Sequence, residues 1–109
     1  MSEFSLQAER IGAVMHLRPR GDFDLIAAWQ VEKALRDVDA RDTREIVVDL
    51  RELTFIDSTG LQTITRGAQR AREQAMEFTI VRAPSEMDRV FELTGTYEGV
   101  NLVDTLPGE

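Results

Sequence analysis

Several features are missing from the 109-residue chain, and each absence excludes a class of protein. There is no cysteine, so the protein forms no disulfide and performs no thiol chemistry. No apolar run approaches the roughly 20 residues of a membrane span. The first ten residues lack the basic and apolar parts of a secretory signal. We therefore expect a cytoplasmic protein with no membrane partner.

Basic residues are also few and scattered. The chain has 13 Lys and Arg against 20 Asp and Glu, and its net charge is -7. Because nucleic-acid binding takes most of its affinity from cations that meet phosphates, a nucleic-acid partner is excluded. An acidic surface fits a basic protein partner better.

The remaining composition is that of an ordinary globular protein, with 42% hydrophobic and 30% charged residues. A chain of this length buries roughly two thirds of its unfolded surface. It therefore needs no metal or cofactor to fold, and none is predicted. We expect one domain over residues 1–109, because no repeat, linker or low-complexity segment divides the chain.

Hydrophobic periodicity predicts strands that alternate with helices. A period of two favours strands over 4–8 and 11–17, and short apolar runs favour strands over 45–50, 78–82 and 100–103. Steps of three and four residues predict helices with the inward residues Ala28, Val31, Leu35 and Val38; Leu61, Ile64, Ala68, Ala71 and Ala75; and Met87, Val90, Phe91 and Thr94. This order indicates an α/β domain, with a mixed, mostly parallel sheet of about five strands and helices packed on it.

The sequence L-T-F-I-D-S-T-G-L at 53–61 places two hydroxyl residues at the start of the second helix. Asp57 or Ser58 can serve as the N-cap of that helix, since their oxygens accept its free N–H groups. The same residues can form a functional site, because sites in open α/β sheets form at the carboxyl ends of strands. A second acidic turn, with Asp22 and Asp24, lies elsewhere in the chain.

Two enzymatic interpretations of these residues are weak. A nucleophilic Ser58 needs a base, but the only histidine, His16, lies on the opposite face of its predicted strand from the apolar residues, and no Gly-x-Ser-x-Gly elbow is present. A Mg²⁺ site on Asp22, Asp24 and Asp57 would be chemically reasonable. Response-regulator receiver domains, which are phosphorylated on an aspartate, also use a lysine that follows a late strand. Here the only lysine, Lys33, lies inside the first predicted helix. Such acids are more often caps and turn residues, and Asp24, which precedes Leu25 and Ile26, can simply cap the first helix. No metal site and no enzyme is therefore predicted.

The order and spacing of four short segments resemble the STAS domain, and specifically bacterial anti-sigma factor antagonists. The segments are Gly21-Asp22-Phe23-Asp24, Ile46-Val47-Val48-Asp49-Leu50, Phe55-Ile56-Asp57-Ser58-Thr59-Gly60-Leu61 and Phe91-Glu92-Leu93-Thr94-Gly95. Together they extend over nearly the whole chain, which identifies it as a single STAS-like domain.

The resemblance implies that Ser58 is the phosphoacceptor, with Thr59 as a weaker candidate. An anti-sigma factor that is also a serine kinase would phosphorylate it with its own bound ATP. The unphosphorylated antagonist would bind that kinase and release the sigma factor, and a serine phosphatase would reset the switch. The residues implied to form the partner-binding surface are Asp22, Asp24, Asp57, Thr59, Gly60 and Gln62.

The chain departs from the family pattern at three places. Thr59 stands where a second serine is usual, Phe23 stands where leucine is usual, and Thr96-Tyr97 follows Gly95 where an aliphatic residue is commoner. One alternative lies inside the same fold. STAS-like domains also act as unphosphorylated interaction modules, as lipid-transport complex subunits or transporter-associated domains.

Overall fold

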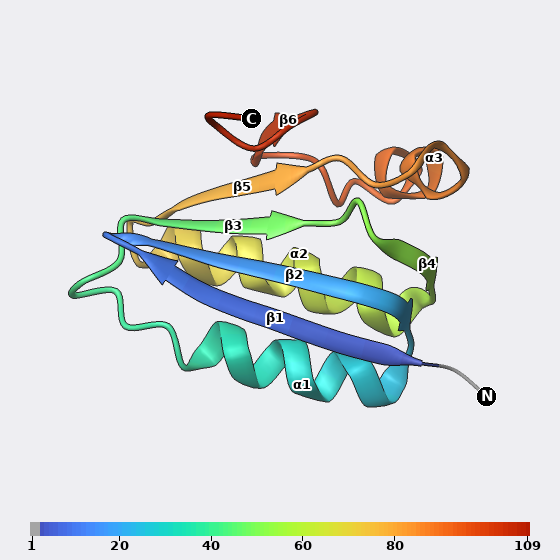
Figure 1. The fold of residues 1–109 in the computed structure, drawn as a ribbon, viewed down its shortest axis with the longest axis horizontal. Coiled ribbons are helices and arrows are strands. Elements are labelled where there is room, and N and C mark those ends of the chain that lie inside the picture. Colours follow the sequence, from blue (N-terminus) through green and yellow to red (C-terminus); the bar gives the residue numbers. More distant parts are fainter. Residues whose placement is uncertain (1–2) are drawn as a thin grey trace.

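The computed structural model describes residues 3–109 (Figure 1). In chain order the elements are β1 (Phe4–Ile11), β2 (Val14–Phe23), α1 (Leu25–Arg36), β3 (Glu45–Asp49), β4 (Leu53–Ile56), α2 (Ser58–Glu73), β5 (Glu77–Val81), α3 (Ser85–Leu93) and β6 (Asn101–Val103). No helix within this described part is long and apolar enough to cross a membrane.

The strands form one mixed sheet in the order β1-β2-β3-β5-β6. β1 and β2 are antiparallel, and every other pairing is parallel. In Figure 1, α1 and α2 lie side by side on one face of the sheet, while α3 lies beyond the carboxyl end of β5. The predicted α/β class and mixed, mostly parallel sheet are confirmed.

A sixth strand, β4, was not predicted. The first half of β2 pairs with β3, and its last residues, Gly21–Phe23, pair in parallel with β4. β4 has only four residues, and a register shift between Gly21 and Asp22 interrupts its pairing. A strand this short carries too little periodicity to be recognised in the sequence. The segment that leads to Ser58 is therefore a strand of the sheet and not part of a long turn.

The core lies between the sheet and the helices. Its fully buried side chains include Phe23, Leu17, Ile46, Ile64, Ile80 and Phe91. The inward faces predicted for the first two helices are confirmed at Ala28, Val31, Leu35, Leu61, Ile64, Ala68 and Ala71, which are all buried.

Three predicted inward positions are wrong. Ala75 follows the end of α2, has a φ of 60° and is exposed, because the chain turns there toward β5. Val90 is 39% exposed and Thr94 is also exposed, because α3 packs on the core mainly through Phe91. A short helix at the end of the sheet contacts the core along a narrower stripe than its apolar pattern suggests.

Candidate functional site

Two adjacent strand ends bring the starts of α1 and α2 together. Phe23 at the end of β2 is paired with Ile56 at the end of β4, and the Asp57 N–H donates to the Phe23 carbonyl over 3.2 Å. The next residue in each chain segment is an aspartate, Asp24 or Asp57. Because parallel strands end at the same edge, both helices begin side by side at this edge of the sheet.

Both aspartates are N-caps. Asp24 Oδ1 accepts the Ala27 N–H over 3.1 Å, which confirms the prediction that Asp24 caps the first helix. Asp57 Oδ1 accepts the Gly60 N–H over 3.0 Å at the start of α2. Of the two residues predicted to cap this helix, the structure selects Asp57. Ser58 is the first helical residue, and its hydroxyl is not needed to cap the helix.

Gly60 allows α2 to begin close to β2. A Cβ atom at this buried position would lie 2.7 Å from Phe23 Cδ1, 2.8 Å from Ile56 Cγ1 and 3.0 Å from the Phe23 carbonyl oxygen. The first two distances are shorter than real Cβ contacts and the third is tighter than most of them, so only glycine fits here without a shift of Phe23 and Ile56. This glycine fixes the position of the first turn of α2, and with it the position of Ser58.

The Ser58 side chain is exposed and lines an open groove of about 320 Å³. The groove lies between α2 and the end of α3 with the loop that follows it. Its lining residues are Ser58, Leu61, Gln62, Thr65, Arg66, Thr94 and Thr96. Within residues 3–109 the Ser58 hydroxyl makes no side-chain hydrogen bond that holds it against the protein. It is therefore accessible to a modifying enzyme or a bound partner.

Hydrogen bonds between threonine hydroxyls fix the side of the groove that the end of α3 and the following loop form. Thr96 is 2% exposed, and its Oγ1 lies 3.3 Å from Thr65 Oγ1 and 3.0 Å from Thr94 Oγ1. Thr94 Oγ1 also donates to the Val90 carbonyl over 2.7 Å. These contacts join α2 to the end of α3, so the groove has a defined shape before any partner binds.

Tyr97 supports this side of the groove from inside. Its ring stacks on Phe91 with centroids 5.2 Å apart and planes 9° apart. Its hydroxyl donates to Asp88 Oδ1 over 2.7 Å and accepts the Ala83 N–H over 3.3 Å. Burial and the hydrogen bond to Asp88 both raise the pKa of Tyr97, so the hydroxyl stays protonated and continues to donate. The aromatic residue that departs from the family pattern thus anchors the loop beside the groove.

The other residues predicted for the site divide into two groups. Gln62 lines the groove one turn after Ser58 and is exposed. Thr59 is partly buried, and its carbonyl accepts the Thr63 hydroxyl over 2.9 Å. Thr59 is thus less accessible than Ser58, although it is the next residue in the chain.

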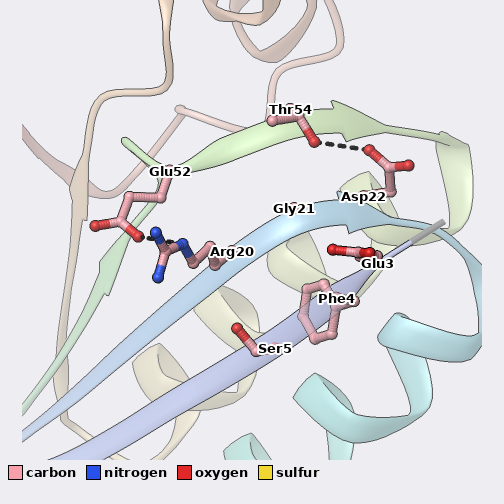
Figure 2. Close-up of a pocket in the computed structure, with 8 residues that line it drawn as sticks. All are labelled: Glu3, Phe4, Ser5, Arg20, Gly21, Asp22, Glu52 and Thr54. Carbon is pink, nitrogen blue, oxygen red and sulfur yellow. Dashed lines mark hydrogen bonds and ion pairs between the residues drawn. The ribbon is translucent and has the colours of Figure 1, made fainter.

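Asp22 lies in a different hollow. Its Oδ1 accepts the Thr54 hydroxyl over 2.7 Å, and Arg20 forms an ion pair with Glu52 nearby, over 3.1 Å (Figure 2). This second hollow has a volume of about 430 Å³ and is lined by residues of β1, β2 and β4 and of the segments next to them. It shares no lining residue with the Ser58 groove. The structure therefore brings Asp24 and Asp57 together at one edge but turns Asp22 away from the groove.

One further charged cluster lies outside both hollows. Asp49 is 4% exposed and binds Arg51 Nη2 over 2.9 Å and Arg18 Nε over 3.3 Å. Burial alone would raise the pKa of Asp49, but the hydrogen bonds from Arg51 and the positive charge of Arg18 outweigh it and lower that pKa. Among residues 3–109 no cluster of three or more histidine, aspartate or glutamate side chains could hold a metal ion.

Sequence reasoning missed most of the groove. Leu61 was identified only as a core residue, and Thr65, Arg66 and Thr96 were not assigned to the site. Thr94 and Thr96 lie more than 30 residues after Ser58 in the chain, so no local pattern connects them. Two signals were present in the sequence: the segment Phe91-Glu92-Leu93-Thr94-Gly95, which marks the end of α3, and the departure from the family pattern at Thr96-Tyr97. Neither shows that this part of the chain faces Ser58.

Comparisons with known proteins agree with this architecture. An anti-sigma-B factor antagonist of Listeria monocytogenes is 28% identical over 75 residues, which cover 69% of this chain and 66% of the relative. That match spans slightly less than two thirds of the relative's length.

Solved structures are similar over most of the chain. An anti-sigma factor antagonist from Mycobacterium paratuberculosis superposes with a TM-score of 0.80 at 24% identity, over 95% of this chain and 88% of that one. The Bacillus protein SpoIIAA superposes at 18% identity both unphosphorylated, with a TM-score of 0.76 over 94% of this chain and 90% of that one, and phosphorylated, with a TM-score of 0.73 over 91% of each. These likenesses show a shared fold. The model of the STAS domain matches residues 5–107, from β1 to the segment after β6. A match of that extent means that the chain belongs to the STAS domain family.

Proposed function

We propose that this STAS domain is an anti-sigma factor antagonist controlled by phosphorylation of Ser58. Its unphosphorylated form binds an anti-sigma factor serine kinase and so releases a sigma factor. The kinase phosphorylates Ser58 with its own bound ATP and thereby ends the interaction, and a serine phosphatase restores the active form. The observation that carries the proposal is the exposed Ser58 hydroxyl, which lines an open groove and leaves the capping of α2 to Asp57.

The folded domain can accept a phosphate at Ser58 without rearrangement. The group would add roughly -1.5 to -2 charges at the first residue of a 16-residue helix. The partial positive charge and free N–H groups of a helix N-terminus favour an anion there. The adjacent Asp57 carboxylate opposes it, so the two effects partly cancel. Because Ser58 is exposed, a phosphate also displaces no packed side chain.

A bound partner responds differently from the free domain. When the groove is covered, the phosphate loses its water, and a partner shaped for a hydroxyl offers it no matching charge. An unpaired charge in an interface costs several kcal/mol, and each 1.4 kcal/mol is a tenfold loss of affinity. Phosphorylation can therefore switch binding off through local charge alone.

The remaining residues are assigned roles by their positions. Asp57 and Gly60 hold Ser58 at a fixed place, and Gln62 offers an amide one turn farther along the groove. Asp24 and Thr59 lie near the strand ends at which α1 and α2 begin, and they extend the binding surface beyond the groove. Asp22 would contact the partner outside the groove, from the neighbouring hollow.

The test is a pull-down from lysate of the source organism with Ser58→Ala and Ser58→Glu as paired baits. Ser85→Glu is the matched control, because Ser85 is also exposed and is the first residue of a helix, α3. We expect mass spectrometry to identify an ATP-binding anti-sigma factor on Ser58→Ala and Ser85→Glu, and to find it lost from Ser58→Glu.

A different pattern would reject the proposal. If all three baits retain the same proteins, the domain is an unphosphorylated interaction module, as in a lipid-transport complex or beside a transporter. If Ser85→Glu loses the partner as well, any added negative charge at a helix start prevents binding, and Ser58 has no specific role.

A further inference from the structure

One outer strand of the sheet is long and exposes its backbone. β1 has eight residues and, within the described chain, pairs only with β2 (Figure 1). At the opposite edge β6 has three residues. β1 contains no proline, and its pairing with β2 runs without a bulge from Phe4 to Ile11. A long regular edge strand without such protection is a template for pairing with another strand.

The hydrogen bonds show which groups of β1 point outward. The Asp22 N–H donates to the Glu3 carbonyl over 2.9 Å, so Glu3 and Asp22 are a hydrogen-bonded pair of the antiparallel ladder. Such pairs alternate along an antiparallel ladder, so the backbone N–H and C=O groups of every odd-numbered residue of β1 point toward β2. Pro19, which has no N–H, accordingly lies opposite an even-numbered residue, Leu6.

It follows that the N–H and C=O groups of Phe4, Leu6, Ala8 and Arg10 point away from β2. No hydrogen bond outside the β1–β2 ladder uses their main chain within residues 3–109. Four residues with one donor and one acceptor each form a regular outward row.

We propose that β1 pairs antiparallel with β1 of a second copy of this chain, with Gln7 opposite Gln7. Phe4 then lies opposite Arg10, and Leu6 opposite Ala8. All outward groups of both strands are used, and they form eight hydrogen bonds from four donors and four acceptors in each copy. The two sheets join into one, with α1 and α2 of both copies on the same face.

The charged residues favour this register over the two registers shifted from it in either direction. Here Glu9 lies opposite Ser5, and Glu3 lies opposite Ile11, so no like charges lie directly opposite each other. A shift that places Leu6 opposite Leu6 puts Glu3 opposite Glu9, and like charges directly opposite are destabilising. A shift the other way, with Ala8 opposite Ala8, leaves Phe4 without a partner residue in the strand.

The proposed pairing of β1 with β1 leaves the Ser58 groove open. Figure 1 shows β1 at one side of the sheet and α3 with its following loop toward the other. The groove lies between α2 and that loop, and none of its lining residues belongs to β1. The dimer therefore presents two independent grooves, and this inference does not rest on the proposed function.

The test is sedimentation velocity of the purified protein from about 1 µM to about 1 mM, a range that covers weak to moderate self-association. Ala8→Pro removes one outward N–H from each copy, and proline is tolerated where an edge N–H faces solvent. Ala8→Ser keeps that N–H and is the control. We expect Ala8→Pro to weaken dimerisation about tenfold or more, and Ala8→Ser to leave it unchanged.

A second pair of variants tests the register without touching the backbone. Ser5→Lys would place a positive charge opposite Glu9 of the other copy, and the symmetric dimer contains two such pairs. Each favourable pair raises the dimerisation constant by a factor of about two to three. We expect dimerisation about fivefold tighter for Ser5→Lys and correspondingly weaker for Ser5→Glu. Thermal unfolding of both variants controls for Arg20, which lies opposite Ser5 within one copy.

Amide exchange supplies an independent signature. Protection of the Phe4, Leu6, Ala8 and Arg10 amides should rise with protein concentration, while the odd-numbered amides are protected at every concentration. A protein that stays monomeric over the whole range overturns the proposal. So does a dimer that is insensitive to Ala8→Pro and to the sign of the charge at position 5.

Discussion

Gly60 offers a direct test of how the start of α2 is positioned. Alanine normally favours a helix over glycine by about 1 kcal/mol, so Gly60→Ala should stabilise the protein if only helix propensity mattered. At this site the added Cβ would lie 2.7 Å from the Phe23 ring, 2.8 Å from Ile56 and 3.0 Å from the Phe23 carbonyl oxygen. Overpacking of this kind costs about 1–3 kcal/mol, and the carbonyl belongs to a strand that cannot move alone. The propensity gain offsets about 1 kcal/mol of that cost, so we expect Gly60→Ala to lower the free energy of unfolding by up to about 2 kcal/mol.

Gly67 is the matched control in the same helix. A Cβ there would meet Leu35 Cδ1 at 2.7 Å, but its next contacts are at 3.5 Å and the crowded atom is the end of a flexible side chain. Gly67→Ala should be neutral or stabilising by up to about 1 kcal/mol. Urea unfolding measures both variants, and each kcal/mol corresponds to roughly 4 °C in melting temperature. If Gly60→Ala proves as stable as Gly67→Ala, the close approach does not fix the position of Ser58.

Three further predictions concern the residues around the site and the sheet. Asp57→Ala should lower the free energy of unfolding by about 1 kcal/mol in urea, while Ser58→Ala should change it by less than about 0.5 kcal/mol; the opposite order would make Ser58 the cap. Asp49→Asn should destabilise the protein most at neutral pH. Because the pKa of Asp49 is lowered on folding, its stabilisation is present above the unfolded value of 3.8 and is lost as the pH falls through the folded pKa. The gap between variant and parent should thus narrow in melts below about pH 4, and a gap that is constant with pH would contradict this assignment. Tyr97→Phe should cost about 1–2 kcal/mol by calorimetry, because it keeps the ring stacking but leaves the Ala83 N–H and Asp88 without their shared partner; an unchanged melting temperature would mean that this hydroxyl does not hold the loop.

The sequence predicted the parts of the fold that repeat a regular pattern. The inward stripes of the first two helices, from Ala28 to Leu35 and from Leu61 to Ala71, are buried as their spacing requires. The cap at Asp24 was also predicted, because an aspartate before an apolar helix has a specific local role. Such features depend on neighbours within one or two turns, so the local sequence contains the information.

The parts that failed depend on contacts between distant segments. β4 is a strand because β2 extends beyond β3 and offers its last residues for pairing, which no property of Leu53–Ile56 alone reveals. Asp22 and Asp24 are two residues apart, yet Asp22 points into one hollow while Asp24 caps a helix. The groove wall at Thr94 and Thr96 meets Ser58 only through the packing of α3 at the end of the sheet.

The central claim is that a phosphate on Ser58 abolishes binding to an anti-sigma factor. The most direct measurement is a calorimetric titration of the purified anti-sigma factor with three forms of this protein: unmodified, with phosphoserine introduced at position 58, and with phosphoserine at position 85. We expect at least about a 100-fold loss of affinity for phosphoserine at 58 and less than about a threefold change for phosphoserine at 85. Equal affinities for the unmodified protein and the form phosphorylated at 58 would contradict it.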